Sequence, residues 1–386
     1  MLTTEEFDAT LAKTGMNVKR QLEDIFQAFG LDTTHLDNAI FTTDRGSNII
    51  SALREEERLD CINHVLNRVV QPSLEEKNAP REICNLLTAV KKLVRYVKKN
   101  NLQDLLSKTL KQCNSTCWNS IFYMLKSVLD TYDELHKIFA LHKAAEIHRV
   151  SKINYNLLKQ LTDFLELFSI VTKVFEEEKQ PTLHLVIPKM AKLKKHCEVT
   201  IQDSPPLKAI KKKASSFITS KFNPHILHKV AVFLNPRQKS MRALNKEDQE
   251  LVLEYVNERA DALSPNFNLV NESSSPPSKK SRYEDEFDDI VEDEPHISEV
   301  QAYQKQQLNL SNEDTVLSYW QANEKIFPAL SALARKVFSV MATSSASERN
   351  FSHAGVVVSA RRSCLKSSSV NDVLFLNSGI HAKKYI

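Results

Sequence analysis

The sequence predicts a mainly α-helical protein with a small α/β part, and three observations support this. Only five of its 386 residues are glycine, so few turns with positive φ are available, which disfavours hairpin-rich β folds. Apolar residues recur at intervals of three and four along most of the chain, as they do on amphipathic helices. One short β-prone run, 39–43, near the N-terminus predicts the α/β part.

The N-terminal part opens with helical apolar spacing over 3–29, which predicts one or two amphipathic helices. The β-prone run 39–43 then leads to Asp44, to a turn containing Gly46, and to a helix from Ile49 onward. In layered α/β folds, sites are built at the carboxyl end of strands, where Asp44 is expected. The same position also suits a simple turn-forming or helix-capping aspartate, so both roles stay open.

Nearly every segment from Cys61 to about Leu263 is expected to be helical. Segments with helical apolar spacing are 83–99, 118–139, 155–178, 183–197 and 247–263. Prolines lie between most of them and mark their ends. These segments predict an all-α block. After residue 298, apolar periodicity returns and predicts a second folded part up to about His381.

The stretch 264–298 changes character, because serines and prolines give way to an acidic run with few large apolar residues. Such a composition predicts a disordered linker. Eight acids lie between Glu284 and Glu294, and without them the formal net charge of +4 becomes +12 on the rest of the chain. That excess favours a polyanion as a partner. Lys279, Lys280 and Arg282 form a short basic cluster that is typical of a nuclear address, so we expect the nucleus, with the cytoplasm as the alternative.

Several classes of protein are disfavoured. No stretch of 18 or more apolar residues occurs and the N-terminus does not look like a signal peptide, so we expect a soluble intracellular protein without a membrane partner. Six scattered cysteines indicate reduced thiols, and the pair Cys113 and Cys117 lacks the second pair that a zinc site needs. Common nucleotide-binding, hydrolase and metalloprotease motifs are missing, so no small-molecule substrate is expected.

Five short motifs stand in an order and at spacings that resemble the hAT superfamily of DNA transposases. They begin at Thr42, Cys61, Ser115, Ala231 and Ser347, and the last reads Ser-Glu-Arg-Asn-Phe-Ser. The resemblance implies an RNase H-like core, truncated here and interrupted by a long all-helical insertion domain. The implied domains are 1–112 (partial core with flanking helices), 113–263 (insertion), 264–298 (linker) and 299–386 (C-terminal dimerisation region completing the core).

The resemblance also implies roles for individual residues. Asp44 matches the second aspartate and Glu348 the glutamate of the family's catalytic carboxylate set, which holds Mg²⁺ or Mn²⁺. Cys61 and His64 match the family's CxxH motif. Trp118 matches a tryptophan that stacks on an extruded base, a role suited to the large face of an indole. Arg349, next to Glu348, is the second nucleic-acid-binding candidate.

Departures from the family pattern point to an inactive protein. The first catalytic aspartate would precede the helices expected over 3–29, and the family's N-terminal zinc finger is not found either. Cys117 replaces an arginine beside Trp118, which removes a phosphate contact. Because phosphoryl transfer depends on positioned charge, losing one ligand of a two-metal site should abolish activity. We therefore expect no cofactor, and Mg²⁺ or Mn²⁺ at Asp44 and Glu348 only if the site still works.

Each candidate also has a purely structural interpretation. Cys61 and His64, one helical turn apart, are commonly core residues. Trp118 would usually open an amphipathic helix within a core, and Glu348 with Arg349 would usually be an ion pair. The order of the motifs, and no single residue, favours the functional interpretation.

Three hypotheses follow. The first is a transposase-derived, catalytically inactive protein that self-associates through its C-terminal region and binds DNA. The residues expected at the dimer face are apolar: Leu330, Leu333, Val337, Phe338, Leu374 and Phe375. The alternative is a fragment of an active transposase, performing metal-dependent DNA cleavage and strand transfer, that lacks its upstream aspartate and zinc finger. The third is an adaptor that binds only proteins.

Overall fold

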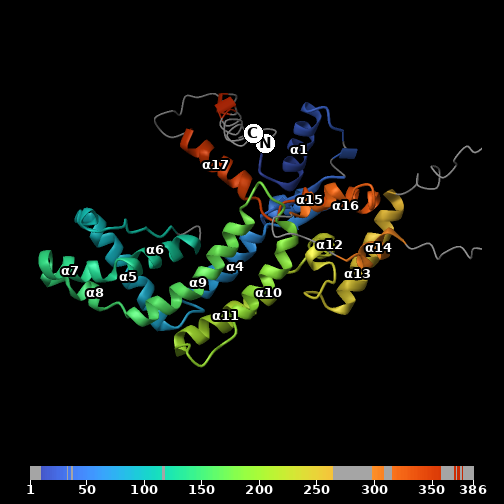
Figure 1. The fold of residues 1–386 in the computed structure, drawn as a ribbon. Coiled ribbons are helices and arrows are strands. Elements are labelled where there is room, and N and C mark those ends of the chain that lie inside the picture. The colour runs from blue at the N-terminus through green and yellow to red at the C-terminus, as the bar shows by residue number, and fades with distance from the viewer. Residues whose placement is uncertain are drawn as a thin grey trace, which may run out of the picture. The chain divides into compact units, whose positions relative to one another are not determined.

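A computed structural model describes residues 10–32, 34–35, 38–114, 118–263, 298–307, 315–357, 369–370, 372–373 and 376. These residues are mainly helical, as predicted (Figure 1). The chain divides into two compact units, each built from separate stretches. Unit 1 comprises Met1–Thr182, Pro188–Asn223 and Met341–Ile386, and unit 2 comprises Leu183–Ile187 and Pro224–Val340. These boundaries differ from the predicted domains, because the helical block 113–263 is shared between the units.

Unit 1 contains the small α/β part. Strand β1 (Ile40–Thr43) pairs in parallel with β2 (Glu57–Asp60), with Ile40 opposite Glu57 and Thr43 opposite Asp60. The connection between them contains helix α3 (Ser47–Ala52), against which α1 (Gly15–Ala28) packs. A Cβ atom on Gly15 would lie 2.5 Å from the Cβ of Ser51, so this close approach requires glycine. Two strands are all the sheet in the described residues, and the RNase H-like core remains a prediction.

Strand β2 was not predicted, because three of its four residues are charged. Leu59 is buried, and its charged neighbours Arg58 and Asp60 pair with each other. The Arg58 guanidinium donates to Thr43 Oγ1 at 3.1 Å, to Asp60 Oδ1 at 2.6 Å, and to the backbone oxygen of Asp44 at 3.1 Å. These bonds join the ends of both strands and hold the chain at Asp44.

The rest of unit 1 is helical, and its core lies among α4, α6, α9 and α11, which contact one another in pairs. Its helices are α4 (Ile62–Ser73), α5 (Arg81–Lys99), α6 (Trp118–Asp130), α7 (Tyr132–His142), α8 (His148–Ser151), α9 (Tyr155–Phe175), most of α10 (Val186–His196), α11 (Pro205–Lys221) and α17 (Ser345–Val357), with the 3-10 turns η1 (Leu102–Leu105) and η2 (Ala144–Glu146). The single segment expected over 118–139 is two helices, which meet at Thr131.

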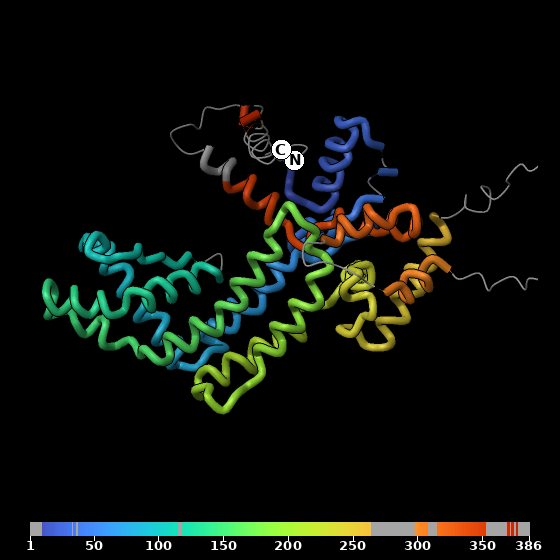
Figure 2. Tube along the Cα trace, viewed as in Figure 1, coloured from blue at the N-terminus to red at the C-terminus, as the bar shows by residue number. Residues whose placement is uncertain are grey.

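A short C-terminal segment, Met341–Thr343, completes unit 1. Thr42 Oγ1 in β1 donates to the Met341 oxygen at 2.8 Å, and the Ile62 amide at the start of α4 donates to the Ala342 oxygen at 3.0 Å. Thr343 Oγ1 donates to the Phe175 oxygen at the end of α9, at 3.0 Å. Figure 2 shows the consequence, with α17 in red beginning beside the end of the green α9.

Unit 2 is a helical cluster around aromatic side chains. Its elements are η3 (Leu183–Leu185), α12 (Ile226–Leu234), η4 (Pro236–Gln238), α13 (Lys246–Leu263), α14 (Glu299–Lys305), α15 (Val316–Ala322) and α16 (Pro328–Phe338). The fully buried Tyr303 contacts the rings of Phe233, Trp320 and Phe327. Its hydroxyl donates to the Phe233 oxygen at 3.0 Å, and Trp320 Nε1 donates to the Leu234 oxygen at 2.8 Å. These bonds give partners to buried polar groups, which would destabilise the fold if they were left unpaired.

Four residues expected at a dimer face are core residues of unit 2. Leu330, Leu333, Val337 and Phe338 on α16 are at most 4% exposed, and α16 packs against α12 and α13 of its own chain. Helical apolar spacing reports a buried face, but it cannot say whether the same chain or a partner covers it. Leu374 and Phe375 lie outside the described residues. Within the described part of the chain, no helix combines the length and apolar character needed to cross a membrane.

Candidate functional site

The ends of the two strands bring the predicted site residues together. Asp44 directly follows β1, and Cys61 directly follows β2 as the residue that begins α4. His64 lies in the first turn of α4, and Glu348 lies in the first turn of α17. Parallel strands end at the same edge of their sheet, which is why residues 17 apart in sequence meet here. The predicted location of Asp44 at a strand end is therefore observed.

Three side chains of different chemistry converge at this edge. The Cys61 sulfur, a ring nitrogen of His64 and a carboxylate oxygen of Glu348 all lie within 4.8 Å of one another. His64 Nδ1 and Glu348 Oε1 are 3.5 Å apart. Cys61 is fully buried, whereas the side chains of His64 and Glu348 are 38% and 52% exposed. The cluster is thus buried at Cys61 and accessible to solvent at His64 and Glu348.

The groups at this edge shift the pKa values of His64 and Cys61 in opposite directions. Hydrogen bonding with Cys61 is the main cause that raises the pKa of His64, against the lowering effect of burial, and the carboxylates of Glu348 and Asp44 add to the rise. Burial raises the pKa of the Cys61 thiol, but hydrogen bonds from His64 and Ser344 outweigh it, so the pKa of Cys61 is lowered overall. These neighbours therefore favour the charged form of each group relative to its ordinary pKa.

Ser344 orients two members of the cluster. Its backbone N–H donates to the Cys61 sulfur at 3.3 Å, and its hydroxyl donates to Glu348 Oε1 at 2.8 Å. Its backbone oxygen accepts from the Glu348 amide at 3.1 Å, which begins α17. Asp44 has a local role, since its Oδ1 accepts from the Gly46 amide at 3.0 Å and closes a turn.

Glu176 is a neighbour of the site that the sequence did not reveal. It is half-buried at the end of α9, and burial raises the pKa of its carboxyl; Arg349 opposes this rise and Glu348 adds to it. Asn63, beside His64 in α4, donates to Glu176 Oε1 at 3.3 Å. In the sequence, Glu176 opens a run of three glutamates that looks like a solvated surface, so no sequence signal separates it from Glu177 and Glu178.

The donor atoms nearest Glu348 do not match the metal that the sequence resemblance implied. Mg²⁺ and Mn²⁺ prefer sets of oxygen ligands. The cysteine, histidine and acidic side chains that cluster with Glu348 in the described part of the chain instead offer a sulfur and an imidazole nitrogen. This set does not fit a magnesium centre, so the geometry at Asp44 and Glu348 supports no catalytic step through Mg²⁺ or Mn²⁺.

Arg349 takes part in an ion pair. Its Nε donates to the Glu178 carboxylate at 3.1 Å. Its Nη2 donates to the same carboxylate and to the backbone oxygen of Glu176, the latter at 3.2 Å. These bonds tie α17 to the end of α9. They correspond to the structural interpretation of Arg349, and a contact with nucleic acid remains a prediction.

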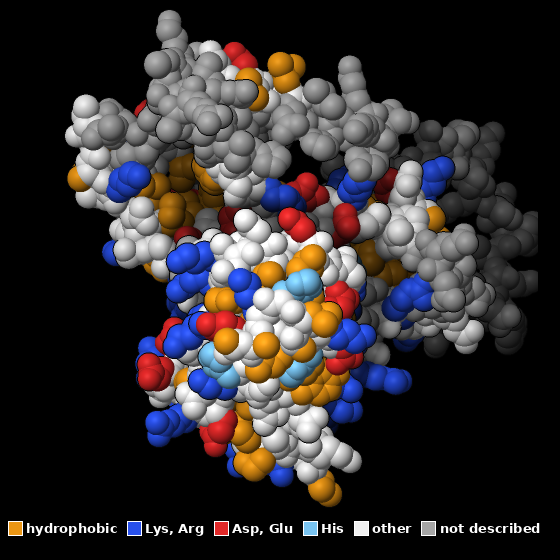
Figure 3. All heavy atoms as spheres, turned by 90° about the vertical axis from the view of Figure 1, so that its left-hand side faces the viewer, with side chains coloured by type: hydrophobic (Ala, Val, Ile, Leu, Met, Phe, Trp, Pro, Cys, Tyr) orange, Lys and Arg blue, Asp and Glu red, His pale blue; other side chains and the backbone are white. Residues whose placement is uncertain are grey.

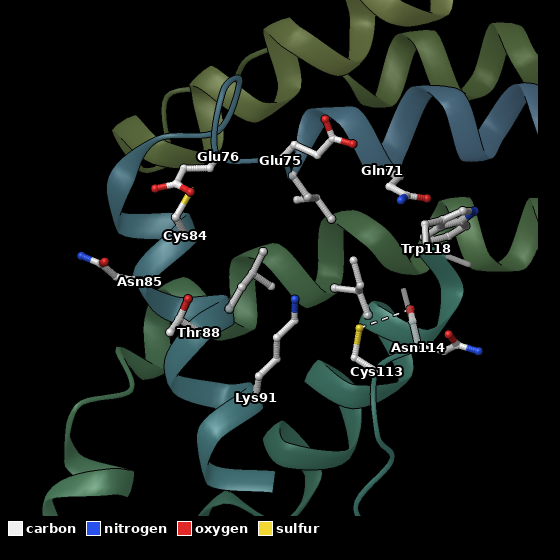
Figure 4. Close-up of a pocket in the computed structure, with 13 residues that line it drawn as sticks. Gln71, Glu75, Glu76, Cys84, Asn85, Thr88, Lys91, Cys113, Asn114 and Trp118 are labelled. Carbon is white, nitrogen blue, oxygen red and sulfur yellow. Dashed lines mark hydrogen bonds between the residues drawn. The ribbon is translucent and has the colours of Figure 1, made fainter. Parts of the chain in front are cut away.

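Trp118 is a buried residue. It is 1% exposed, and its indole meets the edge of Phe168 with ring centroids 6.3 Å apart. It forms one end of an open cavity of about 390 Å³ that Lys91, Cys84 and Cys113 also line (Figure 4). This burial favours the structural interpretation of Trp118 as a core residue, and the base-stacking role remains a prediction.

A basic face lies on helix α5. Lys91, Lys92, Arg95, Lys98 and Lys99 are all exposed there, while the opposite side of the helix is buried. A hollow beside this face is lined by Lys92, His148, Arg149 and Lys152 without an acidic residue. Figure 3 views this end of unit 1, where Lys and Arg side chains stand out along the margins with acidic side chains between them. We call the five α5 residues the α5 basic face.

Comparisons with known proteins agree with the motif pattern. Residues 294–380 match the hAT family C-terminal dimerisation region. The chain is 28% identical over 382 residues to the Hobo transposase of Drosophila melanogaster, covering 86% of this chain and 57% of that protein. It is 24% identical over 336 residues to zinc finger protein 618 of both Mus musculus and Homo sapiens, covering 83% of this chain and 34% of theirs.

Together these matches define a transposase-related protein. More particularly, it is related to the hAT-family transposases, and its residues 294–380 match the family's C-terminal dimerisation region. The chain spans 57% of the length of the fly transposase and about a third of zinc finger protein 618. The activities and partners of those whole proteins therefore enter below only as proposals.

Proposed function

We propose that this transposase-derived protein self-associates through its C-terminal region and binds DNA without performing strand transfer, and that it acts in the nucleus. The observation that carries the proposal is the match of residues 294–380 to a dimerisation region. The fold supports it, because that region keeps exposed apolar side chains although α16 is buried. The proposal has three parts, and each is tested separately.

The first part is a dimer with a second copy of the chain. Within the matched region of unit 2, Leu317 on α15 and Ile326 after it are 46% and 62% exposed. The cores of dimer interfaces are rich in apolar side chains, so these two residues of the matched region are the ones that we propose a second copy covers. Leu317 and Ile326 replace the α16 residues as the described candidates for the dimer face.

Light scattering of the full chain tests this part. Leu317→Asp with Ile326→Asp should lower the measured mass from that of a dimer to that of a monomer, because a charge in an apolar interface is strongly unfavourable. The matched control is Leu251→Asp, which changes a residue of unit 2 that is 45% exposed and lies outside the matched region. An unchanged mass in the double variant would refute this dimer face.

The second part is DNA binding through the α5 basic face. Five cationic side chains on one helical face, beside a hollow without acids, suit a phosphate backbone. Lys91→Glu with Lys92→Glu and Arg95→Glu should weaken binding to duplex DNA at least tenfold and flatten its dependence on salt.

A charge-matched variant controls for the loss of net charge. Arg242→Glu with Lys246→Glu and Lys325→Glu makes the same change at exposed positions of unit 2 and should bind DNA much as the unchanged chain does. If the two triple variants bind equally, the α5 basic face is not the DNA site. A chain that does not bind DNA even at low salt would favour the adaptor hypothesis.

The third part is the lack of catalysis. It is supported by the sulfur and nitrogen donors beside Glu348, which do not suit Mg²⁺. A DNA cleavage assay with Mg²⁺ and with Mn²⁺ tests it, and no product is expected.

The second candidate function is that of an active transposase fragment. The proximity of Asp44 and Glu348 to one histidine favours it, since both matched carboxylates act on the pKa of His64. Metal-dependent DNA cleavage that Glu348→Gln abolishes would establish this function. The same result would refute the inactive protein.

A further inference from the structure

We propose that Cys61, His64 and Glu348 form a binding site for Zn²⁺ in unit 1, with a fourth coordination position open to solvent. The proposal goes beyond self-association and DNA binding and does not depend on either. It rests on the donor atoms, their spacing, and the hydrogen bonds that hold them.

The spacing is close to that of a zinc site. Zn²⁺ binds nitrogen and oxygen at ~2.0–2.1 Å and sulfur at ~2.3 Å, so a tetrahedron places neighbouring donors ~3.4–3.6 Å apart. His64 Nδ1 and Glu348 Oε1 are already 3.5 Å apart. No pair among the three ligand atoms is more than 4.8 Å apart, so movements of the ligand atoms by roughly 1 Å, through small side-chain rotations, would complete the geometry.

The histidine nitrogen is available. His64 Nδ1 is buried and has no hydrogen-bond partner other than the proposed ligands within the described part of the chain. Its 3.5 Å separation from the Glu348 oxygen is too long for a good hydrogen bond. A buried polar atom without a partner is uncommon and needs an explanation. An ion between the nitrogen and the carboxylate would supply one.

The sulfur and the carboxylate are held by neighbouring groups. The Cys61 amide donates to the Thr43 oxygen at 2.7 Å, which ties the cysteine to the end of β1. The Ser344 amide donates to the Cys61 sulfur and the Ser344 hydroxyl to the Glu348 carboxylate. Hydrogen bonds of this kind, made by groups that do not touch the metal, orient ligands in known metal sites. Two parts of the chain, 61–64 and 344–348, are thereby fixed around one point.

The ligand set selects the class of metal. One thiolate, one imidazole and one carboxylate suit Zn²⁺, whereas Mg²⁺ and Ca²⁺ prefer oxygen alone. Three protein ligands with a free fourth position are typical of zinc sites that bind water or a substrate, since structural sites usually have four ligands. The exposed side of Glu348 leaves room for that fourth ligand.

Cobalt titration of the full chain under reducing conditions tests the site. Co²⁺ should give a thiolate-to-metal charge-transfer absorption with one equivalent bound, and Zn²⁺ should remove it by displacement. Cys61→Ser should abolish this absorption. Glu348→Gln should keep the absorption but weaken metal affinity at least tenfold, and Ser344→Ala should weaken it less.

Matched variants make the test decisive. Cys84→Ser changes another thiol of unit 1 away from the cluster and should leave the titration unchanged. Because Cys61 is buried, Cys61→Ser could impair folding, whereas Glu348 lies on an exposed helix turn and its variant is expected to fold. The site is refuted if the unchanged chain gives no charge-transfer absorption with Co²⁺ in excess. It is also refuted if Glu348→Gln binds Co²⁺ and Zn²⁺ as tightly as the unchanged chain does.

Discussion

At the scale of single residues, the buried His184 should make the folded protein less stable at low pH. It lies in η3, is 8% exposed, and meets the ring of Phe338 edge-on at 5.6 Å. Burial lowers the pKa of His184 to about 4, from the ordinary value of 6.5. Its Nδ1 atom has no hydrogen-bond partner among the residues that the structure describes. The folded protein therefore holds this imidazole neutral at pH values where the unfolded chain would protonate it.

The free energy of unfolding should fall as pH falls from about 6.5 to about 4. The contribution is complete above the unfolded pKa and is lost toward the folded pKa, because only the unfolded chain takes up the proton in that window. The loss attributable to His184 should reach ~3 kcal/mol at most, from ~1.4 kcal/mol for each unit of pKa shift. His184→Leu should flatten this dependence in urea denaturation, and His142→Leu, at an exposed position, should not. Equal pH profiles for all three proteins would contradict the prediction.

A substitution at Trp118 can separate its two interpretations, a core residue and a base-stacking residue. Trp118→Ala should destabilise the protein by about 3–5 kcal/mol, because it opens a large cavity beside Phe168. Thermal unfolding measures the change. Phe351→Ala, at a position that is 62% exposed, should alter the melting temperature little. A Trp118 variant with normal stability and weakened DNA binding would support the base-stacking role.

At this scale the sequence predicted the location of Asp44 but not the environment of Trp118. Asp44 follows strand β1, which the β-branched and aromatic residues of that segment predict. The sequence placed Trp118 in a motif and at the start of an apolar helix face, and it could not decide between them. The decision depends on Phe168, which lies 50 residues away and contacts the ring only in the folded chain.

At the scale of elements, helix α11 is anchored by a buried ion pair. Lys211 Nζ lies 2.8 Å from Asp203 Oδ2, and both side chains are 9% exposed. The same ammonium group donates to the Glu198 oxygen at 3.3 Å, which joins α11 to the turn after α10. Burial raises the pKa of Asp203, and hydrogen bonding with Lys211 more than reverses the rise. The pair thus ties α11 to the residues that precede the helix.

Lys211→Met should cost about 3–5 kcal/mol of stability, because it leaves Asp203 as an uncompensated buried charge. Adding Asp203→Leu should recover a substantial part of that loss. Lys212→Met changes the next residue, which is exposed, and should have little effect. Chemical denaturation of the four proteins measures these differences. A double variant no more stable than Lys211→Met would argue against the charge as the cause.

The helices were well predicted because their periodic apolar faces are long. The division between α6 and α7 was not, because apolar spacing continues across Thr131. A signal was present, since Asp133 and Glu134 are acids suited to the first turn of a new helix. Strand β2 had no comparable signal, because its charged residues become favourable only when Arg58 meets Thr43 and Asp60.

At the scale of the whole molecule, the dimerisation region is not an independent part. Residues 294–340 of the match help to build unit 2, and residues from Met341 onward belong to unit 1. Within unit 1, the segment Met341–Thr343 bonds to β1, to α4 and to the end of α9. No sequence pattern could show this division, because the segment pairs with residues up to 299 positions away.

A polypeptide of residues 294–380 alone should therefore remain largely unfolded. Its apolar helix α16 would lose its contacts with α12 and α13, and its Met341–Thr343 segment would lose the backbone partners that it has in unit 1. Circular dichroism and amide exchange of the isolated polypeptide measure this. A cooperative thermal transition would show that the region folds by itself.

The bonds made by Met341–Thr343 also bear on the order in which the protein can form during its synthesis. The amide of Ile62 and the hydroxyl of Thr42 cannot form these hydrogen bonds until the ribosome has added their partners, some 280 to 300 residues later. Until then the strand edge that carries Asp44 and Cys61 stays incomplete, and the nascent chain has to be kept from aggregating. Messages that stop before Met341 would thus leave products that the cell's quality control should remove.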